Sequence, residues 1–521
     1  MADSEPAADR DTALRYESSV AFGCALIALG LAASMIWGTR DFALDDAWIH
    51  LDYAKSLRAG DGLSYNPGDH ETGFSSPLWV LLLSVWPIAG NPVIPVKLLG
   101  ALLHAVTAWA GALLTLELGR ERAGDEHPLP LASMTVLGGV LVACVPTSVQ
   151  AATSGMEVTL ATAVLLTGLR EVLRGRWAPA LILGVLAPWA RPELLFAAVA
   201  FGGTMAATLW TQRRDDPRWR AALALPAGAA VGLGLWVAYC LAVSGAPWPN
   251  AQYIKGIGGG LAGLGYLRDE VLVWQPWLVS LGGAGLLAFA LRDDARARRG
   301  SGFAIVLACV VTWVAIALSR PLHPGVQFFE ARYFAIVAPL PVVLIPLGVG
   351  LAFRPDRARW VRWLALAALV PVAGLSGLQI DQLRDALVEH TEDTFVLHTQ
   401  PAQVLAERLP ADAVVGVEGA GAHRFFTPRT MTIVDLIGLN NAEAARVHFD
   451  RQAKLCTFVR RDLTHLLVPL DWLPQFSPPF AVRVLERFDD PSYSQVRPAH
   501  PMSVVLVEVG GVAPDWAARC G

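Results

Sequence analysis

The chain has 521 residues, of which 54% are hydrophobic in type and 17% are charged, and its mean hydropathy is +0.44. Soluble domains carry roughly a quarter charged residues, so this composition excludes an ordinary water-soluble enzyme and a disordered scaffold. The formal net charge of -4 provides no basic surface for a phosphate backbone, which excludes a nucleic-acid partner. We therefore expect an α-helical polytopic membrane protein.

The six cysteines show neither the spacing of a metal site nor that of a disulfide framework. Most of them lie in apolar stretches, and the sequence leaves open whether Cys456 and Cys520 form a pair. No metal-binding residue is therefore predicted from the cysteines.

Long apolar runs follow a predicted cytoplasmic tail over residues 1–17. A transmembrane helix needs about 20 apolar residues, with roughly 17 tolerated, and about eleven runs approach this length. The run at 76–90 is short and contains Pro77 and Pro87, so we expect a re-entrant or surface-lying helix there. The predicted spans are 18–38, 93–117, 130–147, 155–170, 178–190, 193–210, 221–243, 272–291, 302–319, 333–351 and 361–379.

Arginine collects in a subset of the loops between these spans, and cytoplasmic loops retain positive charge. With a cytoplasmic N-terminus and eleven spans, every arginine-rich loop falls inside the cell. We therefore expect a bacterial cytoplasmic-membrane protein whose long loop 39–92 and C-terminal part lie outside. The arginines concerned are Arg120/Arg122, Arg170/Arg174/Arg176, Arg213/Arg214/Arg218/Arg220, Arg292/Arg296/Arg298/Arg299 and Arg354/Arg357/Arg359/Arg362.

Beyond about residue 380 the composition changes. Charges become regular, and short β-branched runs alternate with amphipathic helix such as 401–410. This alternation predicts an extracytoplasmic α/β domain over 380–521, after a membrane domain over 18–379. The predicted strands are 413–419, 430–438, 464–470, 481–488 and 502–509.

The first outer loop, 40–76, is unusually rich in carboxylates for this chain. Asp45 and Asp46 open an amphipathic helix of about fifteen residues that we expect to lie along the membrane surface. Aspartate favours the first turn of a helix, so one of the pair can serve as a cap. The other then has no structural task, and we expect at least one of them to face a cavity and act chemically.

A second outer feature is Glu157, which lies at the start of a predicted span. A carboxylate at membrane depth is costly and usually functional. Alternatively, Ser154 and Glu157 form a capping box, because their spacing is that of an N-cap and the third helical residue. The capping box explains the spacing fully, so Glu157 is a weaker candidate than the aspartates.

Arg191 and Glu193 occupy the tip of a predicted helical hairpin and are surrounded by apolar residues. They could neutralise each other there. Alternatively, the planar fork of Arg191 points inward and binds a phosphate. We favour the phosphate role, because the tip lies on the predicted outer face, where a lipid phosphate would arrive.

Two later outer segments, 245–256 and 319–341, carry further polar groups. Taken singly, each loop is explained by interfacial anchoring, and Arg332 could merely extend its charge to the interface. Their coincidence on one side favours a functional site, whereas a transporter would place polar groups near the bilayer midplane. The groups concerned are Asn250, Gln252, Tyr253, Lys255, Arg320, His323, Glu330, Arg332 and Tyr333.

The stretch DDAWIHLDYAKSLRAGDGLSYNPGDHETGFSSPLW (45–79) resembles the first outer loop of the GT-C superfamily of membrane glycosyltransferases. Within it, the resemblance is greatest to the group around the mycobacterial terminal arabinofuranosyltransferases, which relates to the aminoarabinose and protein mannosyltransferases. The later elements SGME, ARPE, PWPNAQYIK and FFEARYFAIVAPLP follow the same order, and TIVDLIGLN in the C-terminal domain matches more loosely. The resemblance covers roughly residues 40–340 and implies a GT-C fold.

Enzymes of this superfamily transfer a sugar from a polyprenyl-phosphate donor to an acceptor hydroxyl on the outer face. The resemblance implies that one aspartate of the pair is the catalytic base, with Asp45 the first candidate, Asp46 its partner and Glu157 the weaker alternative. A carboxylate can take the hydroxyl proton, and preset cations stabilise the departing phosphate. The candidate phosphate ligands are Arg191, Lys255, His323 and Arg332, and the candidate substrate-positioning residues are His50, Tyr53, Asn66, Glu71, Glu193, Asn250, Tyr253 and Tyr333.

The sugar and the acceptor (a glycan, a lipid or a protein) stay open, and single-displacement inversion is a hypothesis. No cofactor is expected with certainty, although clustered carboxylates could hold a divalent cation. Two alternatives are a lipid-linked sugar transporter or flippase and a non-catalytic, membrane-anchored glycan-binding protein. The first predicts polar groups in the middle of the spans, and the second leaves the carboxylates of the first loop without a task.

Overall fold

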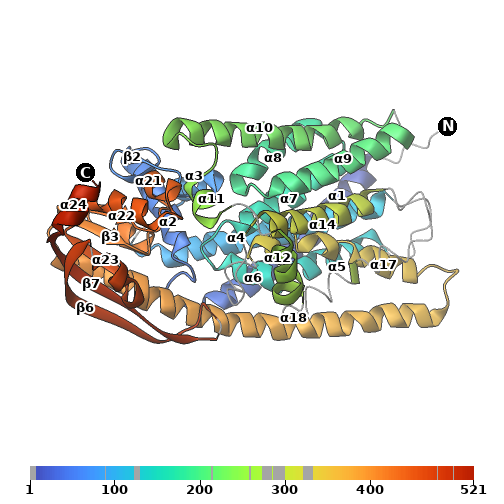
Figure 1. Ribbon diagram of the computed structural model, residues 1–521. Helices are drawn as coiled ribbons and strands as arrows, with labels where there is room; N and C mark the ends of the chain where they lie inside the picture. The colour runs from blue at the N-terminus through green and yellow to red at the C-terminus, as the bar shows by residue number, and fades with distance from the viewer. Residues whose placement is uncertain are drawn as a thin grey trace.

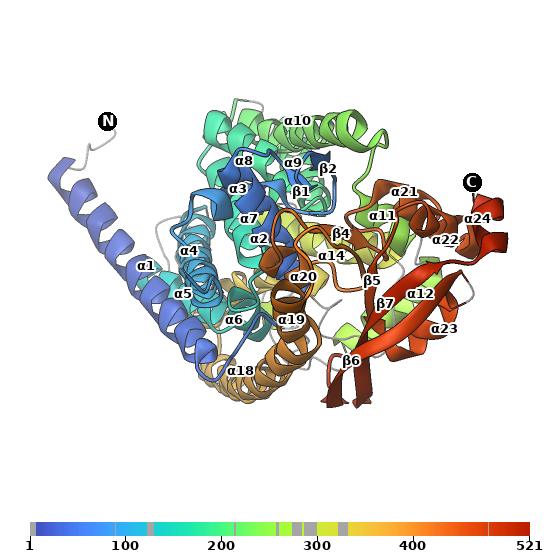
Figure 2. The same cartoon turned by 90° about the vertical axis from the view of Figure 1, so that its left-hand side faces the viewer.

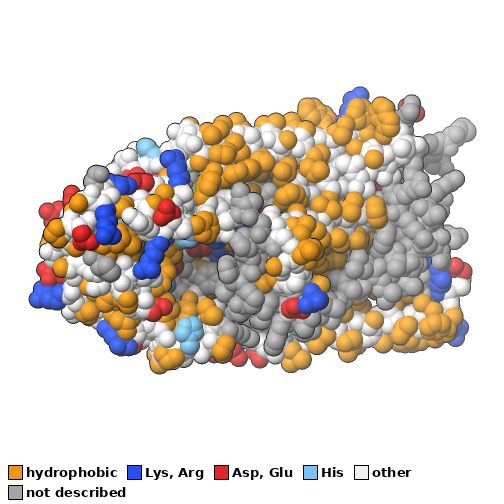
Figure 3. All heavy atoms as spheres, in the orientation of Figure 1, with side chains coloured by type: hydrophobic (Ala, Val, Ile, Leu, Met, Phe, Trp, Pro, Cys, Tyr) orange, Lys and Arg blue, Asp and Glu red, His pale blue; other side chains and the backbone are white. Residues whose placement is uncertain are grey.

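The computed structural model describes residues 7–88, 90–121, 130–212, 215–256, 260–272, 284–285, 300–320, 332–477, 479–496 and 498–520. The chain forms a helical bundle with a sheet-containing C-terminal domain at one end (Figure 1). Apolar side chains cover much of the visible flank of the bundle, whereas charged side chains gather over the C-terminal domain (Figure 3). The protein is a multi-pass membrane protein.

Among the described residues, seven helices are long and apolar enough to cross a membrane, or eight if the bent pair α5–α6 counts as one span. The predicted span 272–291 lies almost wholly outside the described residues, so the count of eleven stays a prediction. The bundle comprises α1 (Ala7–Ile36), α4 (Val93–Arg120), α5 (Leu131–Ala143), α6 (Pro146–Ala152), α7 (Val158–Leu173), α8 (Trp177–Ala190), α9 (Leu194–Gln212), α10 (Arg218–Ser244), α12 (Gly260–Tyr266), η1 (Leu267–Leu272), α14 (Ser301–Ser319), α16 (Pro339–Val342), α17 (Ile345–Ala352) and α18 (Arg359–Thr394).

Two helices extend beyond the predicted boundaries, and the limits of the domains stay predictions. Helix α1 begins at Ala7, so part of the predicted tail 1–17 is helical, while its apolar span is Ser19–Ile36. Helix α18 passes through residue 380 without a break and continues through η3 (Phe395–Thr399) into α19 (Gln400–Arg408). A continuous helix therefore connects the bundle to the C-terminal domain (Figure 1), because no residue at 380 interrupts the helical pattern.

The C-terminal domain contains all five predicted strands: β3 (Val414–Val417), β4 (Thr432–Asp435), β5 (His465–Pro469), β6 (Phe480–Tyr493) and β7 (His500–Val512). Their order is β4-β3-β5-β7-β6, with the β3–β4 and β3–β5 pairs parallel and the β5–β7 and β6–β7 pairs antiparallel. The domain helices are α20 (Ala422–Phe426), α21 (Ala442–Arg446), α22 (Arg451–Val459), η4 (Leu470–Trp472), α23 (Leu473–Phe476) and α24 (Pro514–Cys520). Cys456 and Cys520 form a disulfide, which settles the pairing that the sequence left open and ties α24 to α22.

The first long loop forms α2 (Asp46–Ala59), β1 (Ser64–Asn66), β2 (Asp69–His70) and α3 (Pro77–Val85). At nine residues, α3 is too short to cross a membrane, as expected from its prolines. Nine of the fourteen residues of α2 are buried, because α2 lies beside α20 (Figure 2). The Trp48 ring contacts Phe425 and Phe426 of the C-terminal domain. That α2 lies along the membrane surface stays a prediction.

Candidate functional site

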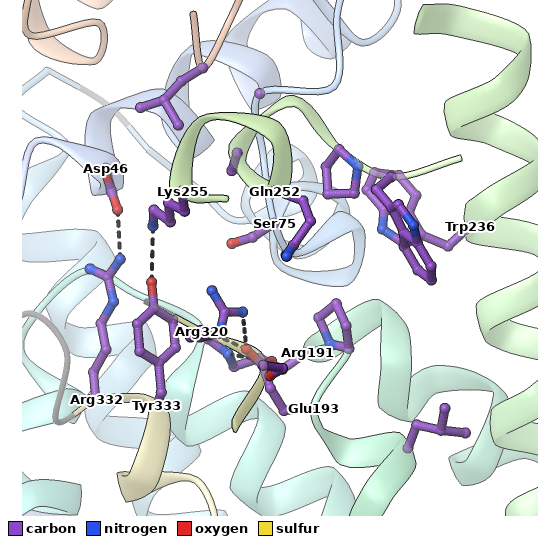
Figure 4. Close-up of a pocket in the computed structure, with 18 of the residues that line it drawn as sticks. Asp46, Ser75, Arg191, Glu193, Trp236, Gln252, Lys255, Arg320, Arg332 and Tyr333 are labelled. Carbon is purple, nitrogen blue, oxygen red and sulfur yellow. Dashed lines mark hydrogen bonds and ion pairs between the residues drawn. The ribbon is translucent and has the colours of Figure 1, made fainter. Parts of the chain in front are cut away.

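A pocket of about 320 Å³ lies where α2, α11 (Asn250–Lys255) and the residues just before α11 meet the end of α8 and the start of α9. One part of its wall is charged, and another part is apolar (Figure 4). The residues that line it are Asp46, Ile49, His50, Gly73, Ser75, Arg191, Pro192, Glu193, Leu195, Phe196, Leu233, Trp236, Trp248, Pro249, Ala251, Gln252, Lys255, Ser319, Arg320, Arg332, Tyr333 and Leu439.

Four cations meet around the ring of Tyr333, from the end of α8, from α11 and from the segment 319–341. Measured to the ring centroid, the guanidinium carbons of Arg191, Arg320 and Arg332 lie at 4.9, 4.1 and 5.3 Å. The ammonium nitrogen of Lys255 lies at 5.7 Å and donates a hydrogen bond of 3.0 Å to the Tyr333 hydroxyl. Like charges at such separations repel strongly in a buried site, so the arrangement calls for anions.

Two of these cations, Arg191 and Arg320, form ion pairs with buried carboxylates. The Arg191 guanidinium lies 2.5 Å from Glu157 Oε1 and 3.3 Å from Glu193 Oε2. Glu193 also pairs with Arg320. The guanidinium of Arg191 is therefore paired with two protein carboxylates. This agrees with the alternative in which Arg191 and Glu193 neutralise each other, with Glu157 as a second carboxylate.

Lys255 differs from the three arginines of the cluster. Arg332 Nη2 lies 2.7 Å from Asp46 Oδ2, but no carboxylate of the described residues lies within ion-pair distance of Lys255. The part of the chain that the structure describes thus sets three carboxylates, Asp46, Glu157 and Glu193, among the four cations.

Asp46 and Glu193 remain ionised despite their surroundings. Burial alone would raise the pKa of Asp46, but the charges on Arg332 and Lys255 outweigh it and lower that pKa to about 2. Burial likewise opposes ionisation of Glu193, and the guanidinium groups of Arg191 and Arg320 outweigh it and lower its pKa. Asp46 therefore presents a charged proton acceptor to the pocket.

The structure places the two adjacent aspartates in different environments. Asp45 is the N-cap residue of α2 but makes no side-chain capping bond. Its Oδ2 and Oδ1 instead accept hydrogen bonds from the Gly421 and Ala422 amides, at 2.7 and 2.8 Å. The capping role is therefore wrong for Asp45, and only Asp46 lines the pocket.

Glu157 lies behind the pocket wall and not in it. The predicted capping box is absent: Glu157 itself precedes α7 without a side-chain cap, and Ser154 Oγ accepts from the Met156 amide at 3.2 Å. The Glu157 side chain is fully buried. Its spacing from Ser154 is that of a capping box, but its carboxylate pairs with Arg191 and does not bond to the helix start.

Several residues predicted to position substrate face the C-terminal domain instead. The Tyr53 hydroxyl donates to Asn440 Oδ1 at 3.0 Å. Asn66 exchanges two hydrogen bonds with the backbone of Ile433, both of 3.0 Å. These two residues are therefore placed to hold the domains together.

Glu71 and Asn250 belong to the same contact. Glu71 accepts from Asn250 Nδ2 at 2.7 Å and from the Ala442 amide at 3.1 Å, and Asn250 Nδ2 also donates to the Leu439 carbonyl at 3.1 Å. We call this contact the interdomain seam. It consists of Asp45, Tyr53, Asn66, Glu71 and Asn250 on one side and Gly421, Ala422, Ile433, Leu439, Asn440 and Ala442 on the other.

The remaining candidates divide as follows. His50, Glu193 and Tyr333 line the pocket, whereas Tyr253 does not. His323 lies outside the described residues. Among the described residues there is no group of three or more His, Cys, Asp or Glu side chains that could hold a metal ion, and a role for a divalent cation stays untested.

Sequence reasoning gave no role to several pocket residues. Arg320 lies in the outer segment 319–341, directly before Pro321. Its presence in the same segment as Arg332 is the feature that could have identified it as a pocket residue. Trp236 and Leu233 lie inside the apolar run 221–243 and carried no signal, because nothing distinguishes a pocket-facing position from a lipid-facing one there.

Comparison with known proteins agrees with this architecture. The chain is 26% identical over 381 residues to the terminal β-(1→2)-arabinofuranosyltransferase of Mycobacterium tuberculosis; the match covers 64% of the chain and 58% of that relative. It therefore spans less than two thirds of the relative's length. Residues 384–505 match a family described as a domain of unknown function (DUF8728).

Solved structures show the same fold. The oligosaccharyltransferase of Archaeoglobus fulgidus, in the apo form, superposes with a TM-score of 0.57 at 13% identity, covering 90% of this chain and 73% of that one. ArnT from Cupriavidus metallidurans, bound to undecaprenyl phosphate, gives 0.53 at 14% identity, covering 92% and 97%. The fold is that of the GT-C membrane glycosyltransferases, as the first-loop resemblance implied.

Proposed function

We propose that the protein transfers a sugar from a polyprenyl-phosphate donor to an acceptor hydroxyl on the outer face of the cytoplasmic membrane, in the assembly of a cell-envelope glycan or glycolipid. One observation carries the proposal. A pocket at the junction of the two domains joins an ionised carboxylate, Asp46, to a cluster of four cations. A carboxylate and a cation cluster are the two groups that this transfer requires.

Lys255 and Arg332 are the proposed ligands of the donor phosphate. Both face the pocket, and Lys255 has no carboxylate partner among the described residues. Arg191, first considered for this role, is already held by Glu157 and Glu193 and acts in our proposal as part of the wall. Cations fixed in place favour the transition state, because negative charge grows on the phosphate as the sugar departs.

Asp46 is the proposed base, in place of Asp45. The acceptor oxygen forms a bond to the anomeric carbon while the bond from that carbon to the phosphate oxygen breaks. The hydroxyl proton passes to the Asp46 carboxylate, and the electron pair of the broken bond leaves with the phosphate. A donor phosphate also competes with Asp46 for Arg332, which frees the carboxylate when the donor is present. Single displacement of this kind inverts the anomeric configuration.

The apolar wall of the pocket suits the lipid part of the donor. Phe196, Leu233, Trp236 and Trp248 line it beside the cations. Two structural relatives carry ligands of this class: ArnT is bound to undecaprenyl phosphate, and the archaeal oligosaccharyltransferase AglB to a dolichol-phosphate and an inhibitory peptide. A charged and an apolar wall side by side match a polyprenyl phosphate better than a free sugar phosphate.

The proposed orientation has support from both domains. Arginine-rich loops lie on the side predicted to be cytoplasmic. The disulfide between Cys456 and Cys520 lies in the C-terminal domain, and such bonds persist in oxidising compartments. Both observations favour a C-terminal domain outside the cell and a pocket at the outer boundary of the membrane.

The decisive experiment identifies the lipid that the protein binds. Mass spectrometry of the purified protein, released from detergent in the gas phase, is expected to show a bound polyprenyl phosphate or its glycosylated form. Incubation with synthetic farnesyl-phosphate sugars (arabinofuranosyl, mannosyl and aminoarabinosyl) is then expected to give transfer from one of them. A protein that binds no polyprenyl phosphate and releases no sugar from any of the three contradicts the proposal.

A further inference from the structure

His50 lies one helical turn after Asp46 on α2, and both residues line the pocket. Residues four apart on a helix are neighbours on one face, with Cβ atoms about 5–6 Å apart. The imidazole is therefore next to the carboxylate that the proposed reaction uses.

The contacts of the ring fix which nitrogen carries the proton. His50 Nδ1 lies 2.9 Å from the main-chain carbonyl oxygen of Asp46. A carbonyl oxygen only accepts hydrogen bonds, so Nδ1 must be the donor. In the neutral imidazole Nε2 then bears a lone pair and no hydrogen, and it can only accept.

Nε2 has no partner within the part of the chain that the structure describes, although His50 is only 2% exposed. A buried acceptor without a partner costs stability, because it has lost its hydrogen bonds to water. The cost is tolerated where a ligand supplies the missing donor, and His50 lines the pocket in which the proposed substrates react.

We propose that His50 Nε2 accepts a hydrogen bond from a sugar hydroxyl in the pocket and thereby helps to determine which sugar is used. The proposal rests on the proposed function. The hydroxyl belongs either to the transferred sugar or to the acceptor, and the chemistry at Nε2 is the same in both cases. His50 is a binding residue in this scheme, and Asp46 remains the base.

Two substitutions separate the nitrogens of the ring. His50→Asn keeps an amide donor near the position of Nδ1, and so keeps the bond to the Asp46 carbonyl, but removes the acceptor at Nε2. His50→Gln places an amide near Nε2, where its oxygen can accept. We expect His50→Asn to lower kcat/KM by roughly 10- to 100-fold, the range for one lost buried hydrogen bond, and His50→Gln to restore most of it.

Deoxy analogues of the substrates identify the hydroxyl. The donor is whichever farnesyl-phosphate sugar the wild type uses, and alkyl glycosides of the same sugars serve as acceptors. If His50 binds the transferred sugar, one deoxy donor has a lower kcat/KM than the parent donor with the wild type, but the same kcat/KM as the parent donor with His50→Asn. If His50 binds the acceptor, the same pattern appears for one deoxy acceptor instead.

His104→Asn is the matched control, because His104 is also fully buried and also has one ring nitrogen without a partner in the described chain, but it lines no part of the pocket. It is expected to change thermal stability without changing discrimination among the analogues. Equal kcat/KM for wild type and His50→Asn on every analogue overturns the inference and leaves the proposed function standing. A wild type that transfers no sugar contradicts the proposed function and the inference together.

Discussion

The first long loop contributes residues to both the pocket and the interdomain seam, yet buried carboxylates have opposite pKa shifts in the two regions. In the pocket, cations outweigh burial, and the pKa of Asp46 falls to about 2. In the seam, burial dominates and raises the pKa of Glu71, although the Asn250 side chain and the Ala442 amide donate to it. Burial likewise raises the pKa of Asp435, which contacts the seam residue Asn440. Cations thus surround the pocket carboxylate, whereas neutral donors surround the carboxylates in and beside the seam.

The difference separates chemistry from assembly. The seam carboxylates Asp45 and Glu71 accept from protein amides. Beside the seam, Asp435 accepts from the Ile437, Gly438 and Asn440 amides at 2.8, 2.8 and 2.6 Å. The pocket cations instead surround open volume, and Lys255 pairs with no described carboxylate. A cation cluster beside open volume is a candidate site for an anionic ligand.

The largest effect is expected for Asp46→Asn, which removes the proposed base with little change in shape. We expect transfer from a farnesyl-phosphate sugar to fall by roughly 10²- to 10⁴-fold, the usual contribution of a general base. Binding of undecaprenyl phosphate should persist or tighten, since Arg332 loses its carboxylate partner.

Asp45→Asn is the matched control for that prediction. Asp45 accepts from two amides with both oxygens, and an asparagine has only one acceptor oxygen to offer them. We expect weakened domain contact with most of the activity retained. A larger loss of transfer in Asp45→Asn than in Asp46→Asn would return the base to Asp45, where the resemblance first placed it.

Arg191→Met should act on stability before it acts on binding. It leaves Glu157 and Glu193 buried without their shared cation, and breaking such a pair typically costs about 3–5 kcal/mol. Thermal unfolding in detergent measures the loss, and the double change Arg191→Met with Glu157→Gln should recover part of it. A stable Arg191→Met protein that fails to bind undecaprenyl phosphate would instead make Arg191 a phosphate ligand.

Glu71→Gln tests the seam. Glu71 now accepts from two donors, the Asn250 side-chain amide and the Ala442 N–H. The glutamine oxygen can accept from one of them, but its NH₂ group then faces the other donor. We expect a loss of about 1–3 kcal/mol, seen as faster proteolysis between the domains, with kcat little changed. Glu443→Gln is the control, because Glu443 is 45% exposed in its ion pair with Arg460 and should cost little. Equal proteolysis of the two variants would remove Glu71 from the seam.

The sequence predicted the elements better than their partners. Periodicity and apolar length suffice for the seven long apolar helices of the described residues and for all five strands, because both are local properties. They could not show that α2 is covered on both sides, since its contacts with Phe425 and Phe426 join residues far apart in the chain. Asp45 and Asp46 are likewise identical as residues, and only the position of the Gly421 amide separates them.

Candidate site residues divided for the same reason. Arg191, Lys255, Arg332 and Tyr333 were placed together by sidedness alone, and the structure brings them around one ring. Tyr53, Asn66, Glu71 and Asn250 satisfied the same criterion but meet the C-terminal domain. Sidedness cannot tell a surface that faces a ligand from one that faces another domain.

A further predicted effect is a pH dependence of stability beside the seam, at Asp52. Burial raises the pKa of Asp52 to about 7, although Arg424 lies 3.9 Å away. In the unfolded chain the group titrates near 3.9, so between about pH 4 and pH 7 the folded state holds a proton that the unfolded state lacks. The stabilising contribution is therefore complete at low pH and is lost as pH rises through 7, at up to about 1.4 kcal/mol per pH unit.

Asp52→Asn removes this titration while keeping the shape of the side chain. Melting temperatures of the wild type, measured from pH 5.5 to 8, should fall relative to those of Asp52→Asn as pH rises. Asp46 should contribute no such slope in this range, because its pKa of about 2 lies well below it. Parallel curves for wild type and Asp52→Asn would mean that Arg424 keeps Asp52 ionised, and that this carboxylate resembles those of the pocket and not those of the seam.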